Sequence, residues 1–290
     1  MPSSTKQLSV QLKPALDQAI QKFIANDVGS PRLNAETLMM FTLDCDRAYL
    51  YAHPERELTN DEAERYEQVV SERARGKPSQ YVTGHQEFWG LDLIVTPAVL
   101  IPRPETEHIV EATLELVRTI GEAPLRIVDV GTGSGCIALA LAHELPYAEI
   151  HAGDISDQAL EVARINCERL NMGSRVELRQ SDLLSGFIEN AKFDFIVCNP
   201  PYVSELKPET VQKQVREFEP HMAVFSGPTG LETYQRLIPQ ARERLAPGGW
   251  LVMEIGYSIE NEVRALLAGW SEVRVKPDLQ GIPRVIAARM

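Results

Sequence analysis

From residue 125 to the end of the chain, short apolar segments alternate with longer amphipathic ones. Segments with the length of buried strands occupy residues 125–130, 150–154, 176–180, 193–198 and 250–255, with two more near residues 271–275 and 284–288. Segments with helical periodicity lie between them, at residues 136–145, 156–170, 231–245 and 258–267. Alternation of this kind builds an open, largely parallel sheet with helices on both faces. We therefore expect an α/β fold for this part of the chain.

The first hundred residues have the pattern of a small helical bundle. Apolar residues recur at helical spacing over residues 12–23. Ser30 and Pro31 have the residue types of an N-cap and a first helical position, which predicts a second helix. That helix is expected to direct four apolar side chains toward a core: Leu33, Leu38, Met39 and Phe41.

The end of this helical region is indicated by turn and capping residues. Thr59 and Glu62 have the spacing of a capping box, and the helix they begin should end near Gly76. Aromatic and glycine residues between positions 81 and 100 indicate a short hairpin. We predict a helical domain at residues 1–78, a β-hairpin linker at residues 79–100 and an α/β domain at residues 101–290.

The overall charge and the cysteines exclude several classes of protein. The chain has 29 Lys and Arg against 41 Asp and Glu, a net charge of -12, which argues against a protein that coats nucleic acid. No apolar run approaches the roughly 20 residues that span a bilayer, and the polar start lacks a secretory signal. No metal site is expected, because none of the cysteines forms a pair with ligand spacing: Cys45, Cys136, Cys167 and Cys198. A cytoplasmic location follows as the default expectation, with no membrane contact.

A glycine-rich turn follows the first strand of the predicted sheet. It consists of Asp129, Val130, Gly131, Thr132, Gly133, Ser134 and Gly135. Glycines there allow a tight turn and a close approach of backbone to ligand, and the pattern is one residue short of the dinucleotide fingerprint. Asp154, at the end of the second strand, has the distance at which an acid accepts bonds from ribose hydroxyls. A ligand with a ribose but no pyrophosphate fits this pattern better than a turn of purely packing value, and S-adenosylmethionine is the candidate.

Further contacts to such a ligand are expected at neighbouring strand ends. Asp129 is placed to bind the ammonium group, and Ile155 follows the ribose-binding acid. Asp182 and Leu183 end the third strand, where an acid accepts from the adenine amino group and an apolar residue covers the ring.

Four residues after the fourth strand have the composition of a catalytic motif: Asn199, Pro200, Pro201 and Tyr202. Two prolines remove backbone donors and leave the Pro200 carbonyl as an acceptor beside the Asn199 side chain. Two such acceptors hold a planar NH2 group by both hydrogens and draw its nitrogen toward tetrahedral geometry. The motif therefore predicts methylation of an amide or aromatic amine by positioning and electrostatic preorganisation.

Together these motifs resemble the PrmC/HemK family of protein-(glutamine-N5) methyltransferases, which modify peptide chain release factors. The resemblance spans nearly the whole chain and rests on residues 81–84, 100–107, 129–135, 199–202 and 278–285. It implies a Rossmann-like methyltransferase domain with a substrate-recognising helical domain. It also implies S-adenosyl-L-methionine as donor, S-adenosyl-L-homocysteine as product, and the glutamine of a Gly-Gly-Gln motif as substrate. In that case Asn199 also contacts the cofactor.

Some assignments stay open at this point. Arg103 borders the substrate channel or pins the linker through a surface ion pair, and Thr229 stands where the family usually has Asp. Two alternative functions are a DNA adenine methyltransferase and a non-catalytic binding module. The first lacks a basic reader, since residues 1–100 hold ten Lys and Arg against fourteen Asp and Glu, and the intact tetrad argues against the second. We expect a monomer that does not bind DNA directly.

Overall fold

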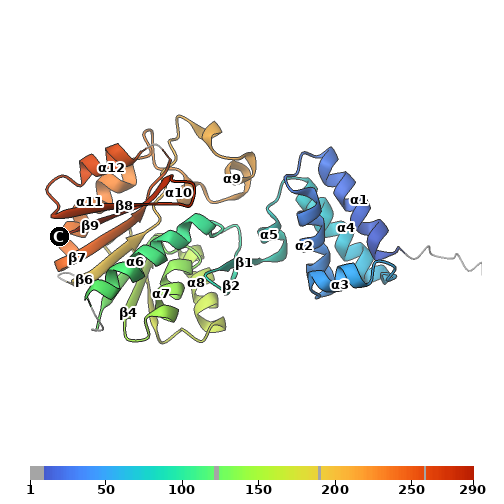
Figure 1. The fold of residues 1–290 in the computed structure, drawn as a ribbon, viewed down its shortest axis with the longest axis horizontal. Coiled ribbons are helices and arrows are strands. Elements are labelled where there is room, and N and C mark those ends of the chain that lie inside the picture. The colour runs from blue at the N-terminus through green and yellow to red at the C-terminus, as the bar shows by residue number, and fades with distance from the viewer. Residues whose placement is uncertain (1–9, 121–123, 189–190, 258) are drawn as a thin grey trace, which may run out of the picture. The chain divides into compact units, whose positions relative to one another are not determined.

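The computed structural model describes residues 10–120, 124–188, 191–257 and 259–290, and Figure 1 shows their secondary structure. The chain divides into two compact units, Met1–Gly84 and His85–Met290. We call them the helical unit and the catalytic unit, and we describe each by itself.

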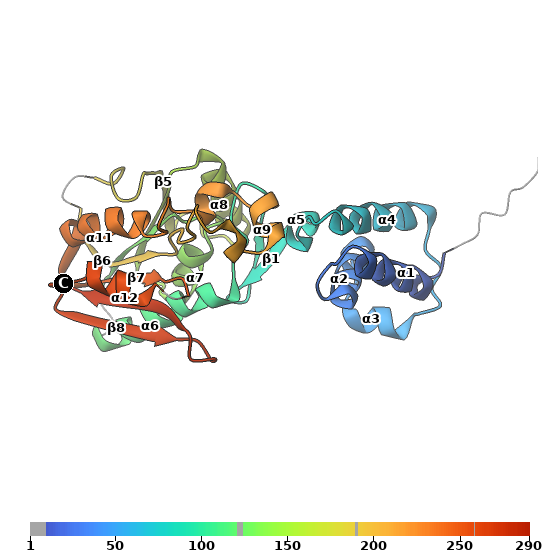
Figure 2. The same ribbon diagram turned by 90° about the horizontal axis from the view of Figure 1, so that it is seen from above.

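The described part of the helical unit contains helices joined by short turns: α1 (Leu12–Ala25), α2 (Pro31–Leu43), α3 (Arg47–Ala52), α4 (Asn60–Ala74) and α5 (Ser79–Thr83). Helices α1, α2 and α4 pack against one another around a core that includes the fully buried Phe23 and Leu38 (Figure 2). The predicted capping box is confirmed, because Thr59 Oγ1 accepts from the Glu62 N–H and the Glu62 carboxylate accepts from the Thr59 N–H.

Two expectations for α2 are wrong. Ser30 precedes the helix as predicted, but its φ of 49° is left-handed and its side chain makes no capping hydrogen bond. Leu33 and Phe41 are 51% and 46% exposed. The buried face of α2 is set by four residues spaced three or four apart, and these two lie off that face: Ala35, Leu38, Met39 and Thr42.

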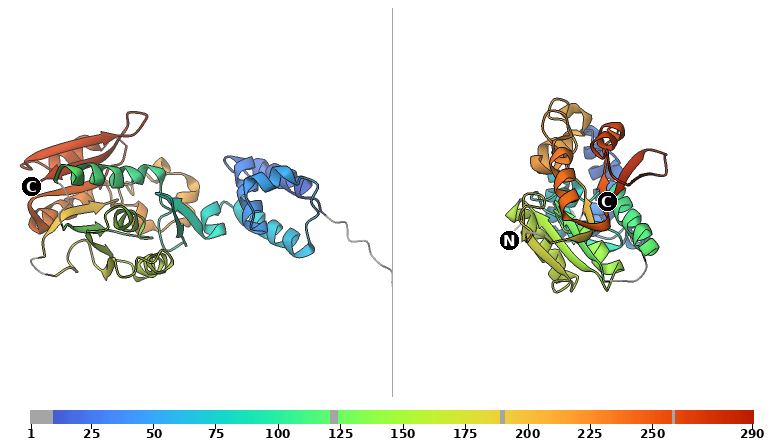
Figure 3. Two further views of the ribbon diagram at one scale, coloured as in Figure 1. Left: turned by 60° about the horizontal axis from the view of Figure 1, so that its bottom comes forward. Right: turned by 90° about the vertical axis from the view of Figure 1, so that its left-hand side faces the viewer.

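The catalytic unit contains a seven-stranded sheet in the order β5-β4-β3-β6-β7-β9-β8. Its strands are β3 (Arg126–Val130), β4 (Glu149–Asp154), β5 (Val176–Gln180), β6 (Phe193–Cys198), β7 (Leu245–Glu254), β8 (Glu272–Pro277) and β9 (Pro283–Arg289). Strands β3 to β7 run parallel, whereas β9 is antiparallel to both β7 and β8. The β8–β9 hairpin extends past the rest of the sheet (Figure 3). The predicted α/β class is confirmed.

Helices cover both faces of this sheet, as the alternation predicts (Figure 1). They are α6 (Glu107–Ile120), α7 (Cys136–Glu144), α8 (Asp157–Arg169), α11 (Glu232–Arg244) and α12 (Glu260–Leu266). Successive strand residues point to opposite faces. Ile127 therefore belongs to the core under α6, α7 and α8, whereas Val128 belongs to the core under α11 and α12.

Most element boundaries agree with the sequence expectations to within one or two residues, and β7 is the main exception. It was expected to begin at Trp250 after a turn, but it begins at Leu245, which pairs with Phe193 across an irregular register. Of the helix expected at residues 258–267, Ser258 lies outside the described residues.

Short elements complete the catalytic unit. The predicted hairpin is formed by β1 (His85–Phe88) and β2 (Leu91–Ile94). A 3-10 turn, η1 (Pro104–Thr106), leads into α6, so the helical conformation starts at Pro104 as expected. Between β6 and α11 the chain forms η2 (Pro208–Thr210), α9 (Lys213–Phe218) and α10 (His221–Val224), which the sequence analysis did not predict. Among the residues described, no helix is long and apolar enough to cross a membrane.

Candidate active site

The glycine-rich turn lies between β3 and α7 and is fastened to the end of β4. Gly131, Gly133 and Gly135 have φ values of 73°, 55° and 85°, a left-handed conformation that side chains with a Cβ rarely adopt. The N–H groups of Gly131 and Thr132 donate to the Gly153 carbonyl at 2.8 and 2.9 Å. The turn is therefore held as an extension of the β3–β4 pairing.

Asp154 ends β4 and organises the backbone around it. Its Oδ2 accepts from the Gly133 N–H and its Oδ1 from the Ser156 N–H, both at 2.9 Å. A carboxylate has about four acceptor positions, so two bonds leave capacity for a ligand. Ser156 in turn caps α8 by accepting from the Ala159 N–H, as the sequence predicts.

Asp129 has a different environment from the rest of the turn. It is fully buried and does not belong to the residues that line the adjacent cavity. Its Oδ2 accepts from the Thr132 hydroxyl at 2.7 Å, whereas Oδ1 has no hydrogen-bond partner among the described residues. Burial raises the pKa of this carboxyl from 3.8 to about 7.

A cavity of about 440 Å³, which we call the first cavity, opens at the carboxyl ends of β3, β4, β5 and β6. This is the edge at which open parallel sheets bind ligands. It brings together most of the predicted cofactor residues: Gly131, Thr132, Gly133, Ser134, Asp154, Ile155, Asp182, Leu183 and Asn199. Gly135 lies just beyond, at the start of α7.

The acid at the end of β5 is already paired. Asp182 Oδ2 accepts from Arg236 at 2.6 Å, and both side chains are half exposed. Leu183 has a left-handed φ of 53°, unusual for a residue with a Cβ. Only Oδ1 of Asp182 is then left to accept a hydrogen bond from a ligand, because Arg236 occupies Oδ2.

A second cavity, of about 370 Å³, shares part of its lining with the first, including residues of the predicted catalytic motif. Asn199, Pro200 and Pro201 line both cavities, whereas Tyr202 lines only the second. Other lining residues of the second cavity come from the segment between β6 and α11, including Val203, Thr210, Val211, Gln212 and Val224. The motif is therefore a common wall between two compartments.

Hydrogen bonds hold this wall through two buried residues that themselves border the cavities, Thr106 the first and Glu254 the second. Asn199 Nδ2 donates to Thr106 Oγ1 at 2.9 Å, and the Thr106 hydroxyl donates to Glu254 Oε2 at 2.7 Å. The Tyr202 hydroxyl donates to the other oxygen, Glu254 Oε1, at 3.2 Å. Burial raises the pKa of Glu254 from 4.5 to about 7, against the opposing effect of these two hydroxyl donors. Thr106 lies in the 100–107 motif without a role predicted for it, and no local pattern marks Glu254.

Arg103 borders the cavities, and its ion pair has a buried partner instead of the surface partner that the sequence left open. It lines both cavities, and its guanidinium forms an ion pair with the buried carboxylate of Glu219. Glu219 also accepts from the Ile101 N–H at 3.1 Å. The ion pair thus holds the loop before η1 at the rim of both cavities.

The position where the family usually has Asp lies away from both cavities. Thr229 is exposed, and its N–H and hydroxyl both donate to Glu232 Oε1 at 2.9 Å. These bonds tie the turn to the first residue of α11. Thr229 is not among the lining residues of either cavity.

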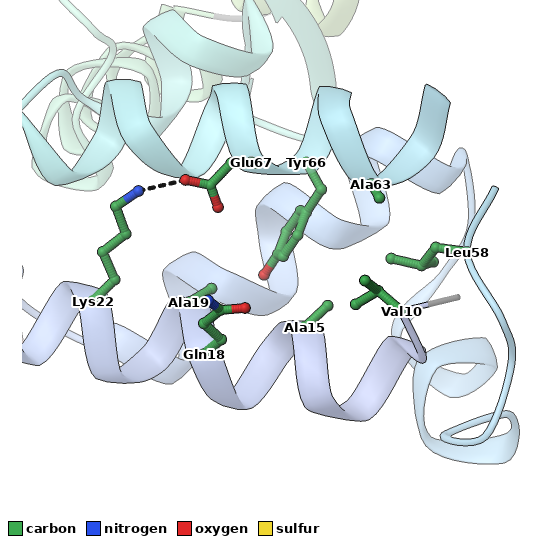
Figure 4. A pocket seen from close by; sticks show the side chains of 9 residues that line it. All are labelled: Val10, Ala15, Gln18, Ala19, Lys22, Leu58, Ala63, Tyr66 and Glu67. Atoms are coloured by element: carbon green, nitrogen blue, oxygen red, sulfur yellow. Dashed lines mark hydrogen bonds and ion pairs between the residues drawn. The ribbon is translucent and has the colours of Figure 1, made fainter. Parts of the chain in front are cut away.

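A third cavity, of about 200 Å³, lies within the helical unit between α1 and α4 (Figure 4). Its lining is largely Ala15, Ala19, Leu58 and Tyr66, and the ion pair of Lys22 with Glu67 lies at one end. No group of three or more His, Cys, Asp or Glu suited to a metal ion occurs anywhere in the described ranges.

Comparison with known proteins places this geometry in context. The model of the PrmC N-terminal domain matches residues 14–84, and the model of the methyltransferase small domain matches residues 106–223. A solved methyltransferase from Pyrococcus furiosus has the same fold, with a TM-score of 0.51 at 20% identity over 78% of this chain and 98% of that one.

Two curated relatives match the chain almost end to end. The release factor glutamine methyltransferase of Koribacter versatilis is 54% identical over 96% of this chain and 98% of its own. The release factor glutamine methyltransferase of Moorella thermoacetica is 42% identical over the same shares. With both cavities, the tetrad and the helical unit in place, the chain belongs to the release factor glutamine methyltransferase family.

Proposed function

We propose that this protein transfers a methyl group from S-adenosyl-L-methionine to a glutamine side-chain amide nitrogen of peptide chain release factors. The target is the glutamine of the Gly-Gly-Gln motif, and the modification tunes translation termination. The observation that carries this proposal is the common wall between the two cavities, built from Asn199, Pro200 and Pro201. A donor in one compartment and an acceptor amide in the other meet at that wall.

The first cavity suits the donor in its chemistry. Asp154 offers free acceptor capacity for ribose hydroxyls, and Ile155 and Leu183 offer apolar contact for an adenine ring beside Asp182. Asp129 Oδ1 and Ser134 Oγ are buried polar atoms without partners in the described part of the chain, near where the charged amino-acid end would lie. When bound, S-adenosylmethionine supplies an electrophilic methyl group and leaves as S-adenosyl-L-homocysteine.

The tetrad residues act on the acceptor amide. The side-chain carbonyl of Asn199 and the backbone carbonyl of Pro200 accept the two N–H bonds of the glutamine NH2 group, and Tyr202 contacts its planar face. These contacts hold the nitrogen in one orientation and localise its lone pair toward the methyl group. Arg103, at the rim of both cavities, contacts the backbone around the glutamine.

The domain roles and the setting belong to the same proposal. Residues 1–78 recognise the release factor, residues 79–100 link the domains, and residues 101–290 carry out the transfer. The enzyme acts as a monomer in the cytoplasm, and its net charge of -12 favours a basic protein surface over a DNA backbone.

The direct test uses a purified release factor and isotope-labelled S-adenosylmethionine. After incubation with the enzyme, mass spectrometry of the digest should locate one labelled methyl group on the glutamine of the Gly-Gly-Gln peptide. A release factor with that glutamine replaced by asparagine is the matched control and should stay unlabelled.

Two results would contradict the proposal. A labelled methyl group on another residue would show that the glutamine is not the target. Absence of label in every release factor tested would show that release factors are not the substrate. Label on a DNA duplex containing adenine would favour the alternative methyltransferase class.

A further inference from the structure

A buried chain of hydrogen bonds connects residues from three distant segments at the common wall. It runs from Asn199 through Thr106 to Glu254 and from Glu254 to Tyr202, with distances of 2.9, 2.7 and 3.2 Å. Thr106 is 2% exposed and Glu254 is 3% exposed. We call Thr106 and Glu254 the support pair.

The direction of each hydrogen bond follows from the chemistry of the support pair. Above its pKa of about 7 the Glu254 carboxylate is ionised and only accepts, so Thr106 gives its single hydroxyl hydrogen to Glu254. The Thr106 oxygen then has lone pairs left and meets Asn199 as an acceptor, which requires the Nδ2 side of the amide. The Asn199 Oδ1 atom is thereby left available as an acceptor.

The direction of these hydrogen bonds matters because the side-chain amide of an asparagine can rotate by about 180° and exchange its oxygen and nitrogen at little steric cost. The two orientations exchange a donor for an acceptor at the same place. With Nδ2 turned toward the cavities, Asn199 would offer N–H bonds to a substrate NH2 group, which itself has N–H bonds to offer. Only the orientation selected by the support pair suits the acceptor amide.

The same carboxylate also fixes the second tetrad side chain. Glu254 Oε1 accepts from the Tyr202 hydroxyl, and Glu254 lines the second cavity beside the ring. Gly256 leaves space for that ring, because a Cβ there would lie 2.7 Å from Tyr202 Cδ2. The position of the ring is thus set by one hydrogen bond and one close backbone approach.

We infer that Thr106 and Glu254 are positioning residues that fix the amide orientation of Asn199 and the ring of Tyr202 for methyl transfer. This inference rests on the proposed function, since it assigns the two residues a part in that reaction. Neither residue needs to touch the transferred group. They increase the fraction of enzyme molecules in which Asn199 and Tyr202 have the orientation that methyl transfer requires.

The test compares two substitutions of Thr106 that differ in the hydroxyl. Thr106→Val keeps the shape and removes the hydroxyl, whereas Thr106→Ser keeps the hydroxyl. Partners that orient a functional side chain typically contribute 10- to 100-fold, so the Val variant should lose about that factor in kcat. KM for S-adenosylmethionine should stay within about twofold and the Ser variant should recover most of the rate, because orientation and not binding is lost.

A second measurement reports orientation without any turnover. In protein labelled with 15N-asparagine, the side-chain NH2 signal of Asn199 is identified by its loss in Asn199→Ala. Its protons should exchange with water faster in Thr106→Val than in the wild type and in Thr106→Ser. This result stands even if the wild type methylates no release factor, so failure of the proposed function and failure of the inference are distinguishable.

Glu254→Gln provides the variant to use if Thr106→Val does not fold. Gln keeps the shape but replaces one acceptor oxygen with a donor, so kcat should fall and Asn199 exchange should quicken in the same way. Three results would each overturn the inference. The first is a kcat of Thr106→Val equal to that of the wild type, and the second is an equal loss of kcat in Thr106→Val and Thr106→Ser. The third is unchanged proton exchange of the Asn199 side chain in both Thr106→Val and Glu254→Gln.

Discussion

Among the described residues, ion pairs hold the buried carboxylates of Glu36 in the helical unit and Glu219 in the catalytic unit, but the catalytic unit also has two buried carboxylates without a cationic partner. In the helical unit, Glu36 is 4% exposed, and its carboxylate forms ion pairs with Arg47 at 3.0 Å and with Arg32 at 3.6 Å. In the catalytic unit, Asp129 and Glu254 are as deeply buried but are bonded by hydroxyl groups, and neither forms an ion pair within the described ranges.

The difference separates carboxylates that support the fold from carboxylates that serve a site. Attraction to a cationic partner offsets part of the desolvation free energy of a buried carboxylate. A buried carboxylate with only hydroxyl partners has less of this compensation, so its pKa is raised. Accordingly, burial raises the pKa of both Asp129 and Glu254 to about 7. Perturbed groups of this kind cluster at functional sites, and here both lie next to the residues that line the cavities.

The largest effect should come from the catalytic wall itself. Asn199→Ala should reduce methyl transfer by about 100- to 1,000-fold, the range measured for loss of one preorganised polar contact. Affinity for S-adenosylmethionine, measured by calorimetry, should change by less than about twofold because the lost contacts are mainly to the amide. Near-normal turnover would contradict the mechanism.

Removal of the acid at the end of β4 should act on binding instead. Asp154→Ala should weaken S-adenosylmethionine binding by about 1.5–3 kcal/mol, because charge-assisted hydrogen bonds are lost and the Gly133 N–H loses its acceptor. Calorimetry gives the dissociation constant directly. An unchanged value would refute the ribose assignment.

Changes of pH should act on the catalytic unit through two carboxyls with raised pKa values, Asp129 and Glu254. Between the ordinary carboxyl pKa values of about 4 and the raised values of about 7, folded Asp129 and Glu254 hold protons that the unfolded chain has released. The stability contributed by these two protonated groups should therefore be lost as pH rises through this window, about 3 to 4 kcal/mol for each group. Within the described part of the catalytic unit, five other carboxyls have lowered pKa values, and their contribution is lost only as pH falls below about 4.5: Asp92, Glu111, Glu177, Glu232 and Asp278.

In the helical unit the resolved carboxyl shifts have the other sign. The hydrogen bond from Lys77 lowers the pKa of Glu72. Burial alone would raise the pKa of Glu62, but the Thr59 N–H and Arg56 hold it below its usual value. Their contribution is present above pH 4.5 and is lost as pH falls through the folded values.

Each unit has a probe that reports on it alone. Trp89, Trp250 and Trp270 all lie in the catalytic unit, so denaturant unfolding followed by tryptophan fluorescence reports its stability. Hydrogen exchange of peptides from residues 10–84 reports the helical unit. Glu254→Gln should flatten the fluorescence-detected slope between pH 5 and 7, and a slope equal to that of the wild type would contradict the assignment.

The smallest effect should come from the ion-paired carboxylate. Glu36→Gln should destabilise the helical unit by only about 1 kcal/mol, because Arg32 and Arg47 are both more than half exposed and solvent screens the pairs. The expected readout is faster hydrogen exchange in residues 10–84. We expect kcat to be unchanged in Glu36→Gln, whereas it falls in Asn199→Ala. This result would show that the ion-paired carboxylate of the helical unit contributes to stability and not to methyl transfer.

The sequence was informative where a feature depends on residues close together in the chain. The glycine turn, the capping box at Thr59 and the ends of most strands are local patterns, and the structure contains all of them. The support pair could not be found in this way, because Thr106 and Glu254 are 148 residues apart and meet only through the sheet order.

Long-range packing also explains where local reasoning went wrong. Residues 247–249 have the composition of a turn, and within β7 they form the irregular stretch between the Leu245–Phe193 and Trp250–Phe195 pairs. Asp129 is fully buried and the cavity wall begins at Val130, so its assignment to the ammonium group of the cofactor stays a prediction.

The common wall also has a thermodynamic consequence. A single set of residues, Asn199, Pro200 and Pro201, borders both compartments, so occupancy of one alters the surface that the other ligand meets. Linkage requires the effect to be reciprocal: whatever factor a bound glutamine loop applies to donor affinity, the donor applies to the affinity for the loop. Any such coupling would be measured as a difference in release-factor affinity between enzyme with bound donor and enzyme with bound demethylated product.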